Sequence, residues 1–202
     1  MVNNIISSAE ETLYKIYDAL NEKYYQGNLP NVVITIQDAK GKYYGWFSCD
    51  RWKNSSEDQL LHEINISPEY FSRSIEELCA TMNHEMVHLY CHLNDIGDTS
   101  ANGKYHNKKF KKEAEERGLI ITKANGIGWS VTTPTDGFVN FVKSLDISNA
   151  FSFFRVLPPK RSNVASSASQ KKYVCPCCGA KLRGKSGLHI ICDDCKETFI
   201  EE

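Results

Sequence analysis

Apolar residues near the amino terminus recur every three or four positions, as they do on the buried face of a helix. This spacing predicts a first helix over residues 8–26, which the sequence Gly-Asn-Leu-Pro at 27–30 ends. The pattern then becomes that of strands: β-branched residues predict one over 31–37, and we expect two more over 43–49 and 61–67. The buried stripe of the first helix is expected to comprise Leu13, Ile16, Tyr17, Leu20 and Tyr24.

A second helix is indicated by a capping-box pattern at residues 74–77, Ser-Ile-Glu-Glu, and by the apolar stripe that follows it. His84 and His88 lie outside this stripe and four residues apart, so both imidazoles project from one face of the helix. Two histidines at this spacing can hold one Zn²⁺ ion while Glu85 acts as a general base on water. The expected core positions are Ile75, Leu78, Cys79, Met82, Met86, Leu89 and Leu93.

After the second helix we expect a polar loop over residues 94–103 and then shorter elements. Helical spacing over 107–117 is ended by Gly118, a residue that favours the end of a helix. The remaining predictions are a strand over 119–121, a turn over 126–129, a helix over 138–145 and a strand over 150–157.

A catalytic zinc normally takes three protein ligands, so a third must be found outside the His-Glu-x-x-His motif. His92 continues the series, but its Cα would lie about 12 Å from that of His84 along the helix, too far for one metal. We therefore assign His92 a packing or supporting role and favour His106, which follows a loop that can fold back to the metal. The carboxylate alternatives are Glu113, Glu115 and Glu116, while His62 and His189 are interpreted as a strand-surface and a ribbon histidine.

The cysteines predict a second metal site near the carboxyl terminus. Two C-x₂-C pairs at the spacing of a zinc ribbon supply four thiolates for a structural, tetrahedral Zn²⁺, and a redox dithiol is the alternative. Cys177 is a spare thiol beside the first pair, and the remaining cysteines, Cys49, Cys79 and Cys91, are predicted to be buried. The four ligands are Cys175, Cys178, Cys192 and Cys195.

Charge is distributed unevenly along a chain whose net charge is only -1. Residues 1–146 contain 15 Lys/Arg and 20 Asp/Glu, whereas residues 147–192 contain 8 Lys/Arg and no acid. Such a segment suggests a polyanionic partner, with DNA phosphates favoured and Tyr173 and His189 available for stacking on bases, although a solvated tail is the alternative. The candidate DNA contacts are Lys171, Lys172, Lys181, Arg183 and Lys185.

Composition completes the picture of a globular protein with 41% hydrophobic and 24% charged residues. Because no stretch has the length and apolarity of a membrane span, we expect a soluble, cytoplasmic protein with no membrane partner. The Pro-Pro pair at 158–159 and the Ser- and Ala-rich residues 162–170 are typical of a linker. We therefore divide the chain into a domain at 1–157, a linker at 158–172 and a ribbon at 173–202.

These motifs resemble the SprT-like metalloprotease family, which includes the Spartan DNA-protein-crosslink proteases. The likeness rests on Leu29-Pro30, the strand region at Gly45, Ile64-Asn65-Ile66, the segment 84–88 and Tyr105-His106-Asn107-Lys108-Lys109-Phe110. It implies an α+β, zincin-like domain with a small sheet and an active-site helix, followed by a zinc ribbon. It also implies His84, His88 and His106 as zinc ligands and Glu85 as the catalytic residue. The chain departs from the Spartan branch in its longer loop between His88 and His106.

Three functions are consistent with these features. The first is a zinc endopeptidase that acts on DNA-associated or DNA-crosslinked proteins, with Tyr90 and Tyr105 as candidates for stabilising the oxyanion. The second is a nucleic-acid-binding or regulatory zinc protein without significant peptidase activity, and the third is a zinc peptidase with no role on nucleic acid. Glu85 and His106 favour an enzyme, because a zinc that only holds helices together needs no general base.

Overall fold

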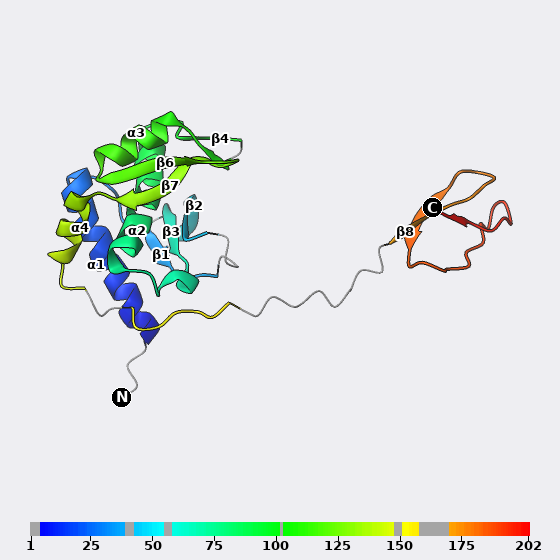
Figure 1. Ribbon diagram of the computed structural model, residues 1–202, viewed down its shortest axis with the longest axis horizontal. Helices are drawn as coiled ribbons and strands as arrows, with labels where there is room; N and C mark the ends of the chain where they lie inside the picture. Colours follow the sequence, from blue (N-terminus) through cyan, green and yellow to red (C-terminus); the bar gives the residue numbers. More distant parts are fainter. Residues whose placement is uncertain (1–4, 39–42, 55–57, 102, 148–150, 158–169) are drawn as a thin grey trace. The chain divides into compact units, whose positions relative to one another are not determined.

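The computed structural model describes residues 5–38, 43–54, 58–101, 103–147, 151–157 and 170–202 (Figure 1). The chain separates into two compact units, Met1–Leu157 and Pro158–Glu202. Helices and small sheets occur together in the first unit, which confirms the predicted α+β class. In the part of the chain that the structure describes, no helix combines the length and apolarity needed to cross a membrane.

The first unit begins with α1 (Ile5–Tyr25), whose buried residues include all of the predicted stripe except Tyr24. A three-stranded sheet follows, in the order β1 (Val33–Thr35), β3 (Gln59–Ile66), β2 (Gly45–Asn54). β1 is parallel to β3, and β2 is antiparallel to it. The three strands predicted from the sequence are therefore confirmed, with β2 reaching five residues beyond its expected end.

A short 3₁₀ helix, η1 (Pro68–Tyr70), leads into α2 (Ile75–Leu93), the helix that carries the His-Glu-x-x-His motif. Ser74 caps α2 as the sequence predicts: its hydroxyl accepts a hydrogen bond from the Glu77 N–H, and the Glu77 carboxylate accepts one from the Ser74 N–H. This reciprocal pair satisfies two backbone donors that a helix start otherwise leaves exposed. The beginning of α2, and hence the register of its histidines, is fixed locally.

The strands that follow α2 in the sequence form a second sheet, with the strand order β4-β5-β7-β6. Its two-residue strands β4 (Thr99–Ser100) and β5 (Tyr105–His106) precede α3 (Lys108–Glu116). The antiparallel pair β6 (Leu119–Ala124) and β7 (Gly128–Pro134) follows, and α4 (Asp136–Lys143) comes next. The sequence indicated a polar loop where β4 lies and only a turn where β7 begins, so it missed the strands β4, β5 and β7.

The motif helix is the centre of the first unit. α2 contacts β2 and β3 of one sheet, β7 of the other, and all three remaining helices (Figure 1). Met82, Met86 and Leu89 are fully buried on it, and the core they form includes Ile16 of α1 and Phe110 of α3. A helix packed on so many sides is held rigidly, which suits a site built on its polar face.

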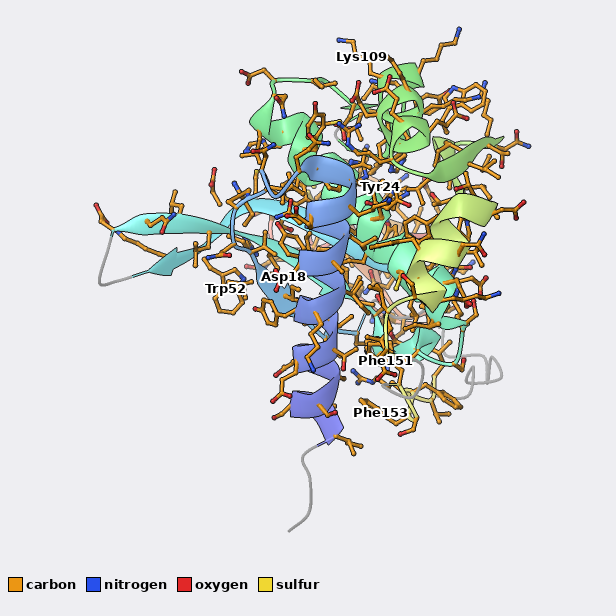
Figure 2. The ribbon with its side chains drawn as sticks, turned by 90° about the vertical axis from the view of Figure 1, so that its left-hand side faces the viewer. Asp18, Tyr24, Trp52, Lys109, Phe151 and Phe153 are labelled. Atoms are coloured by element: carbon orange, nitrogen blue, oxygen red, sulfur yellow. The ribbon has the colours of Figure 1, made fainter. Side chains whose placement is uncertain are left out.

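Three predictions fail in the first unit. Leu93, expected in the core, is 44% exposed at the end of α2. Residues 151–157 form no strand, and Ala150 lies outside the described residues. Instead, the rings of Phe151 and Phe153, labelled in Figure 2, pack on Phe71 at centroid distances of 4.8 and 5.8 Å. The alternating apolar side chains of this segment are explained by packing, not by strand pairing. Cys49 is also exposed where a buried thiol was predicted, whereas Cys79 and Cys91 are buried.

The second unit contains the sheet β10-β8-β9, formed by β8 (Lys171–Val174), β9 (Lys181–Gly184) and β10 (Ile200–Glu201). All its pairings are antiparallel. β8 begins inside the segment assigned to the linker, whose residues 158–169 lie outside the description. The centre of this small unit is Tyr173, which is 1% exposed.

Candidate active site and metal centres

Three histidine side chains converge beside α2. His84 and His88 come from successive turns of the helix, and β5 brings His106 to them across a 22-residue separation. The Nε2 atom of His106 lies 3.2 Å from Nε2 of His84 and 3.0 Å from Nε2 of His88. Tetrahedral bonds of 2.0–2.1 Å to one Zn²⁺ would separate two nitrogens by about 3.3 Å. The donor set and its spacing therefore fit a single zinc ion.

The opposite nitrogens of two of these rings are held by other side chains. Nδ1 of His88 lies 2.5 Å from Asp98 Oδ2, and Nδ1 of His84 lies 2.7 Å from the Thr132 hydroxyl. The Thr132 hydroxyl can donate to the Ser130 carbonyl at 3.4 Å, which leaves its oxygen to accept the Nδ1 proton of His84. Each ring then presents an Nε2 lone pair to the shared point, the arrangement that metal-ligating histidines commonly show.

The loop that carries Asp98 is fastened to the start of α3. The Asn107 side chain caps α3 by accepting from the Lys109 and Phe110 amides and donates to the Gly97 carbonyl at 2.8 Å. The backbone N–H of Asn107 also donates to the backbone carbonyl of Asp98, at 3.0 Å. One residue thus connects the carboxylate that orients His88 to the helix that follows His106.

Phe110 forms an apolar wall behind the histidines. Its ring centroid lies 4.6 Å from those of His84 and His88 and 4.7 Å from that of His106. Burial disfavours the imidazolium form, so the pKa of His84 falls well below its ordinary value and the pKa of His106 falls to about 4. Neutral rings are the form that binds a metal.

Glu85 lies buried beside this cluster, on the side of β2. Burial raises the pKa of its carboxyl to about 7, although His88 and a hydrogen bond from the Phe47 backbone N–H oppose the shift. Gly45 of β2 passes so close that a Cβ there would be 3.3 Å from Glu85 Cγ and 2.6 Å from the Asn65 carbonyl oxygen. A carboxyl with this pKa can exchange a proton near neutral pH, as a general base must.

The alternative candidates lie elsewhere. Glu113 is buried in an ion pair with Arg117, whose NH1 is 2.9 Å from Glu113 Oε2. The guanidinium of Arg117 also covers the Tyr90 ring at 3.7 Å, so Tyr90 is engaged in packing. His92 packs edge-on against His62, with ring centroids 5.3 Å apart. Among the residues that the structure describes, His106 is the one that joins the motif histidines in a group able to hold a metal.

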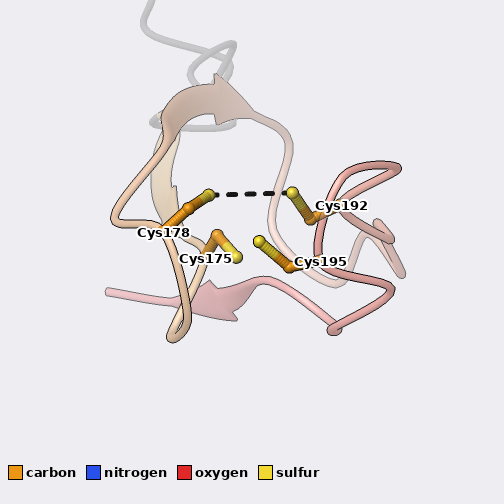
Figure 3. Close-up of side chains that lie close together, drawn as sticks. All are labelled: Cys175, Cys178, Cys192 and Cys195. Atoms are coloured by element: carbon orange, nitrogen blue, oxygen red, sulfur yellow. Dashed lines mark hydrogen bonds between the residues drawn. The ribbon is translucent and has the colours of Figure 1, made fainter.

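The four predicted ribbon cysteines form a second group in the other unit. Figure 3 shows their sulfurs facing a common centre, and the ligand atoms all lie within 4.8 Å of one another. The Sγ atoms of Cys178 and Cys192 are 3.8 Å apart. Four Zn–S bonds of 2.3 Å in a tetrahedron would place two sulfurs about 3.8 Å apart. The cluster therefore fits a structural zinc site.

The two knuckles repeat one backbone pattern. The Cys175 amide donates to the Ala180 carbonyl and the Cys192 amide to the Glu197 carbonyl, five residues on in each case. Gly179 and Lys196 occupy matching positions, and both have positive φ, at 72° and 57°. Amides of the first knuckle, that of Cys178 above all, donate to the Cys175 sulfur and lower its pKa to about 7. Cys177 is exposed and outside the four-cysteine group.

The basic residues of this unit divide by face. In the β8–β9 hairpin Lys172 lies opposite Arg183, and Val174 lies opposite Lys181. The cations Lys172, Lys181 and Arg183 therefore share one face of the hairpin. Lys181, Arg183 and Lys185 are exposed, but Lys172 is ion-paired with Glu202. Lys171 is exposed on the opposite face of the hairpin.

The expected stacking role of Tyr173 is wrong. Its ring is buried in the unit, and its hydroxyl donates to the Lys185 carbonyl while accepting from the Leu188 amide at 3.0 Å. Since a base cannot stack on a covered ring, Tyr173 holds the hairpin together instead. His189, the other residue proposed to stack on bases, is exposed.

Comparison with known proteins places the chain in a family. Residues 13–125 match the SprT-like family, and this segment is more than half of the 202-residue chain. The chain therefore belongs to the SprT-like family, which is generally of the zinc metalloprotease type. The matched segment contains His84, Glu85, His88 and His106, while the four-cysteine group lies beyond it. A search of curated proteins found no match.

Proposed function

We propose that this protein is a zinc-dependent endopeptidase that acts on DNA-associated or DNA-crosslinked proteins. The observation that carries the proposal is the convergence of three imidazole Nε2 atoms beside the buried carboxyl of Glu85. A three-histidine site is a donor set typical of catalytic zinc, because it leaves a position for water or substrate. Membership of the SprT-like family supports the same assignment.

The chemistry divides between the metal and Glu85. When bound to the three histidines, zinc polarises a peptide carbonyl and lowers the pKa of water towards neutrality. Glu85 accepts the proton that water loses as its oxygen attacks the carbonyl carbon, and returns it to the leaving nitrogen as the C–N bond breaks. The hydrogen bond from Phe47 fixes the carboxyl, and Asp98 and Thr132 orient the rings.

A zincin-like arrangement gives the substrate a place to lie. β2 is an outer strand of the sheet β1-β3-β2 and runs beside the buried carboxyl of Glu85. An extended peptide can add to such an edge through backbone hydrogen bonds, which are available in any sequence. This mode suits an enzyme that cleaves many different proteins attached to one kind of nucleic acid.

The DNA-related part of the proposal rests on the second unit. Lys181, Arg183 and Lys185 are exposed on and beside one hairpin, and their charges would neutralise phosphates without reading bases. Replacing Lys181 and Arg183 by Gln in the full chain should weaken DNA binding and reduce its salt slope by about 2. Lys196→Gln is the matched control, because Lys196 belongs to the same unit but pairs with Asp193.

Glu85→Gln tests the enzyme itself. We expect the variant to keep its zinc, measured by mass, and to lose cleavage of a DNA-binding protein crosslinked to duplex DNA. Glu76→Gln, a substitution in the first turn of the same helix, should cleave normally. If Glu85→Gln cleaves at the wild-type rate with zinc bound, the proposed mechanism is wrong.

The same assay separates the three functions considered from the sequence. An enzyme directed to DNA should cleave crosslinked protein faster than free protein, and the Lys181→Gln, Arg183→Gln variant should lose that preference. Equal rates on both substrates would indicate a peptidase with no role on nucleic acid. DNA binding with no cleavage in any condition would indicate a regulatory zinc protein.

A further inference from the structure

A third group of potential metal ligands lies outside both sites already described. Cys49 and Asp50 belong to β2, and His92 lies in the last turn of α2. Their ligand atoms, one sulfur, one carboxylate oxygen and one ring nitrogen, all lie within 4.8 Å of one another. All three residues are exposed, so a metal ion has direct access to them from solvent.

An irregularity in β2 places two of these ligands side by side. The pairing of β2 with β3 is regular up to Ser48 and resumes at Trp52, with a shift of register between them. Asp50 lies within this bulge and has φ +49°, a left-handed conformation that is uncommon for a residue other than glycine. In a regular strand Cys49 and Asp50 would point to opposite faces, whereas the bulge directs both towards His92.

His62 of β3 supports the bulge without joining the group. Its Nδ1 atom accepts a hydrogen bond from the Asp50 backbone N–H at 3.2 Å. Its ring is edge-on to that of His92, with ring centroids 5.3 Å apart. The ring centroid of Phe47 lies 5.9 Å from that of His62 and 6.0 Å from that of His92. These contacts hold both the bulge and the imidazole of His92 in place before any ligand arrives.

We propose that Cys49, Asp50 and His92 bind a further divalent transition-metal ion, of which Zn²⁺ is the best match. A thiolate and an imidazole select a borderline-soft metal over Mg²⁺ or Ca²⁺, which take oxygen ligands. Three protein ligands leave a tetrahedral zinc one position for water. On binding, the thiol of Cys49 loses its proton to solvent, and the thiolate forms the Zn–S bond.

This site is separate from the three-histidine site but shares its helix. His92 follows His88 by one turn, a rise of about 6 Å, so the two ions would lie close together along α2. Its ligands are exposed, whereas the three histidines are half-buried, so water competes more strongly for the metal here. We expect this site to fill after the other two as the free zinc concentration rises.

Zinc counting on the full chain tests the assignment. Native mass spectrometry over a series of buffered Zn²⁺ concentrations should show one ion per chain fewer in Cys49→Ser and in His92→Ala than in the wild type. Cys177→Ser and His189→Ala replace an exposed cysteine and an exposed histidine of the other unit and should lose none. With Co²⁺ as the probe, Cys49→Ser should lose the near-ultraviolet absorption of one thiolate–cobalt bond.

The test does not depend on the proposed peptidase activity. In a His84→Ala background, adding the Cys49→Ser substitution should still remove one zinc ion per chain, even though the three-histidine site is already damaged. Asp50→Asn keeps the size of the side chain and should weaken binding of the last ion without changing the melting temperature of the zinc-free protein. Equal zinc counts for wild type, Cys49→Ser and His92→Ala at every concentration would overturn the proposal.

Discussion

The carboxylate of Asp98 lies 2.5 Å from Nδ1 of His88, measured from Oδ2, and both side chains are largely shielded from water. An acceptor at this position keeps the proton on Nδ1, so the Nε2 lone pair faces the other two histidines. Replacing Asp98 by Asn removes the charge but keeps the shape. We expect Asp98→Asn to weaken zinc binding at the three-histidine site about 10- to 100-fold. Competition with a chromophoric chelator measures this affinity.

Asp95→Asn is the control for that substitution. Asp95 lies in the same connection and has φ +53°, a conformation that Asn tolerates well. Its replacement should leave zinc affinity unchanged. An equal loss in both variants would show that the effect comes from the net charge of the loop and not from the contact with His88.

Gly128 offers a test of how β5 holds His106. A methyl group at Gly128 would come within 2.2 Å of the His106 carbonyl oxygen and 2.8 Å of the Tyr105 ring, and Gly128 also has φ +74°. We expect Gly128→Ala to push β5 away, lowering both zinc affinity and the free energy of unfolding. The first is measured with the chelator, and the second by urea unfolding followed through tryptophan fluorescence.

Gly126→Ala separates the steric clash from backbone strain. Gly126 has φ +81° but no atom within 4 Å of the position that a Cβ would take. Its substitution should cost only the left-handed penalty of about 1–2 kcal/mol and should not alter zinc binding. Were the two glycine variants to bind zinc equally, close packing of β5 on β7 would not be what positions His106.

The position of α2 and the shared face of its two histidines could be predicted because they depend on residues close together in the sequence. Ser74 and Glu77 fix where the helix begins, and four-residue spacing then decides which face His84 and His88 share. The position of His106 followed from ligand chemistry and loop reach, and the structure brings its Nε2 within 3.2 Å of the other two. For α2 a few neighbouring residues contain the information, whereas His106 was identified by its ligand chemistry across 18 residues from His88.

What the sequence did not show depends on contacts between distant segments. Thr132 lies 48 residues from His84, on a strand whose mixed composition resembles a loop, so nothing local identifies it as a partner of that ring. Cys49 looks like a buried thiol in an apolar strand, but it lies in the part of β2, residues 49–53, that is exposed on both faces. Residues 151–157 have the alternation of a strand because Phe151 and Phe153 pack on Phe71.

Asn83, the residue before the motif, is expected to be a major contributor to stability. Its fully buried side chain accepts from the Tyr25 hydroxyl at 2.9 Å and donates to the Arg117 carbonyl at 2.8 Å. Asn83→Ala would leave both partners in the core without a hydrogen bond, which lowers the free energy of unfolding by about 1–3 kcal/mol for each unsatisfied group. Urea unfolding should report the loss, since every tryptophan of the chain lies within residues 1–157. Asn94→Ala, at the exposed end of α2, is the comparison and should change little.

Loss of one ribbon ligand should unfold the second unit alone. Residues 170–202 have few buried apolar side chains besides Tyr173, and a module of this size needs a metal to fold. We expect Cys192→Ser, or chelation of zinc, to abolish hydrogen-exchange protection in β8 and β9, because binding free energy of about 10–16 kcal/mol is what stabilises such sites. Peptides from α1 and α2 should keep their protection, since the first unit has its own core. Cys177→Ser should leave both units protected, and loss of protection in that variant would place the spare thiol among the ligands.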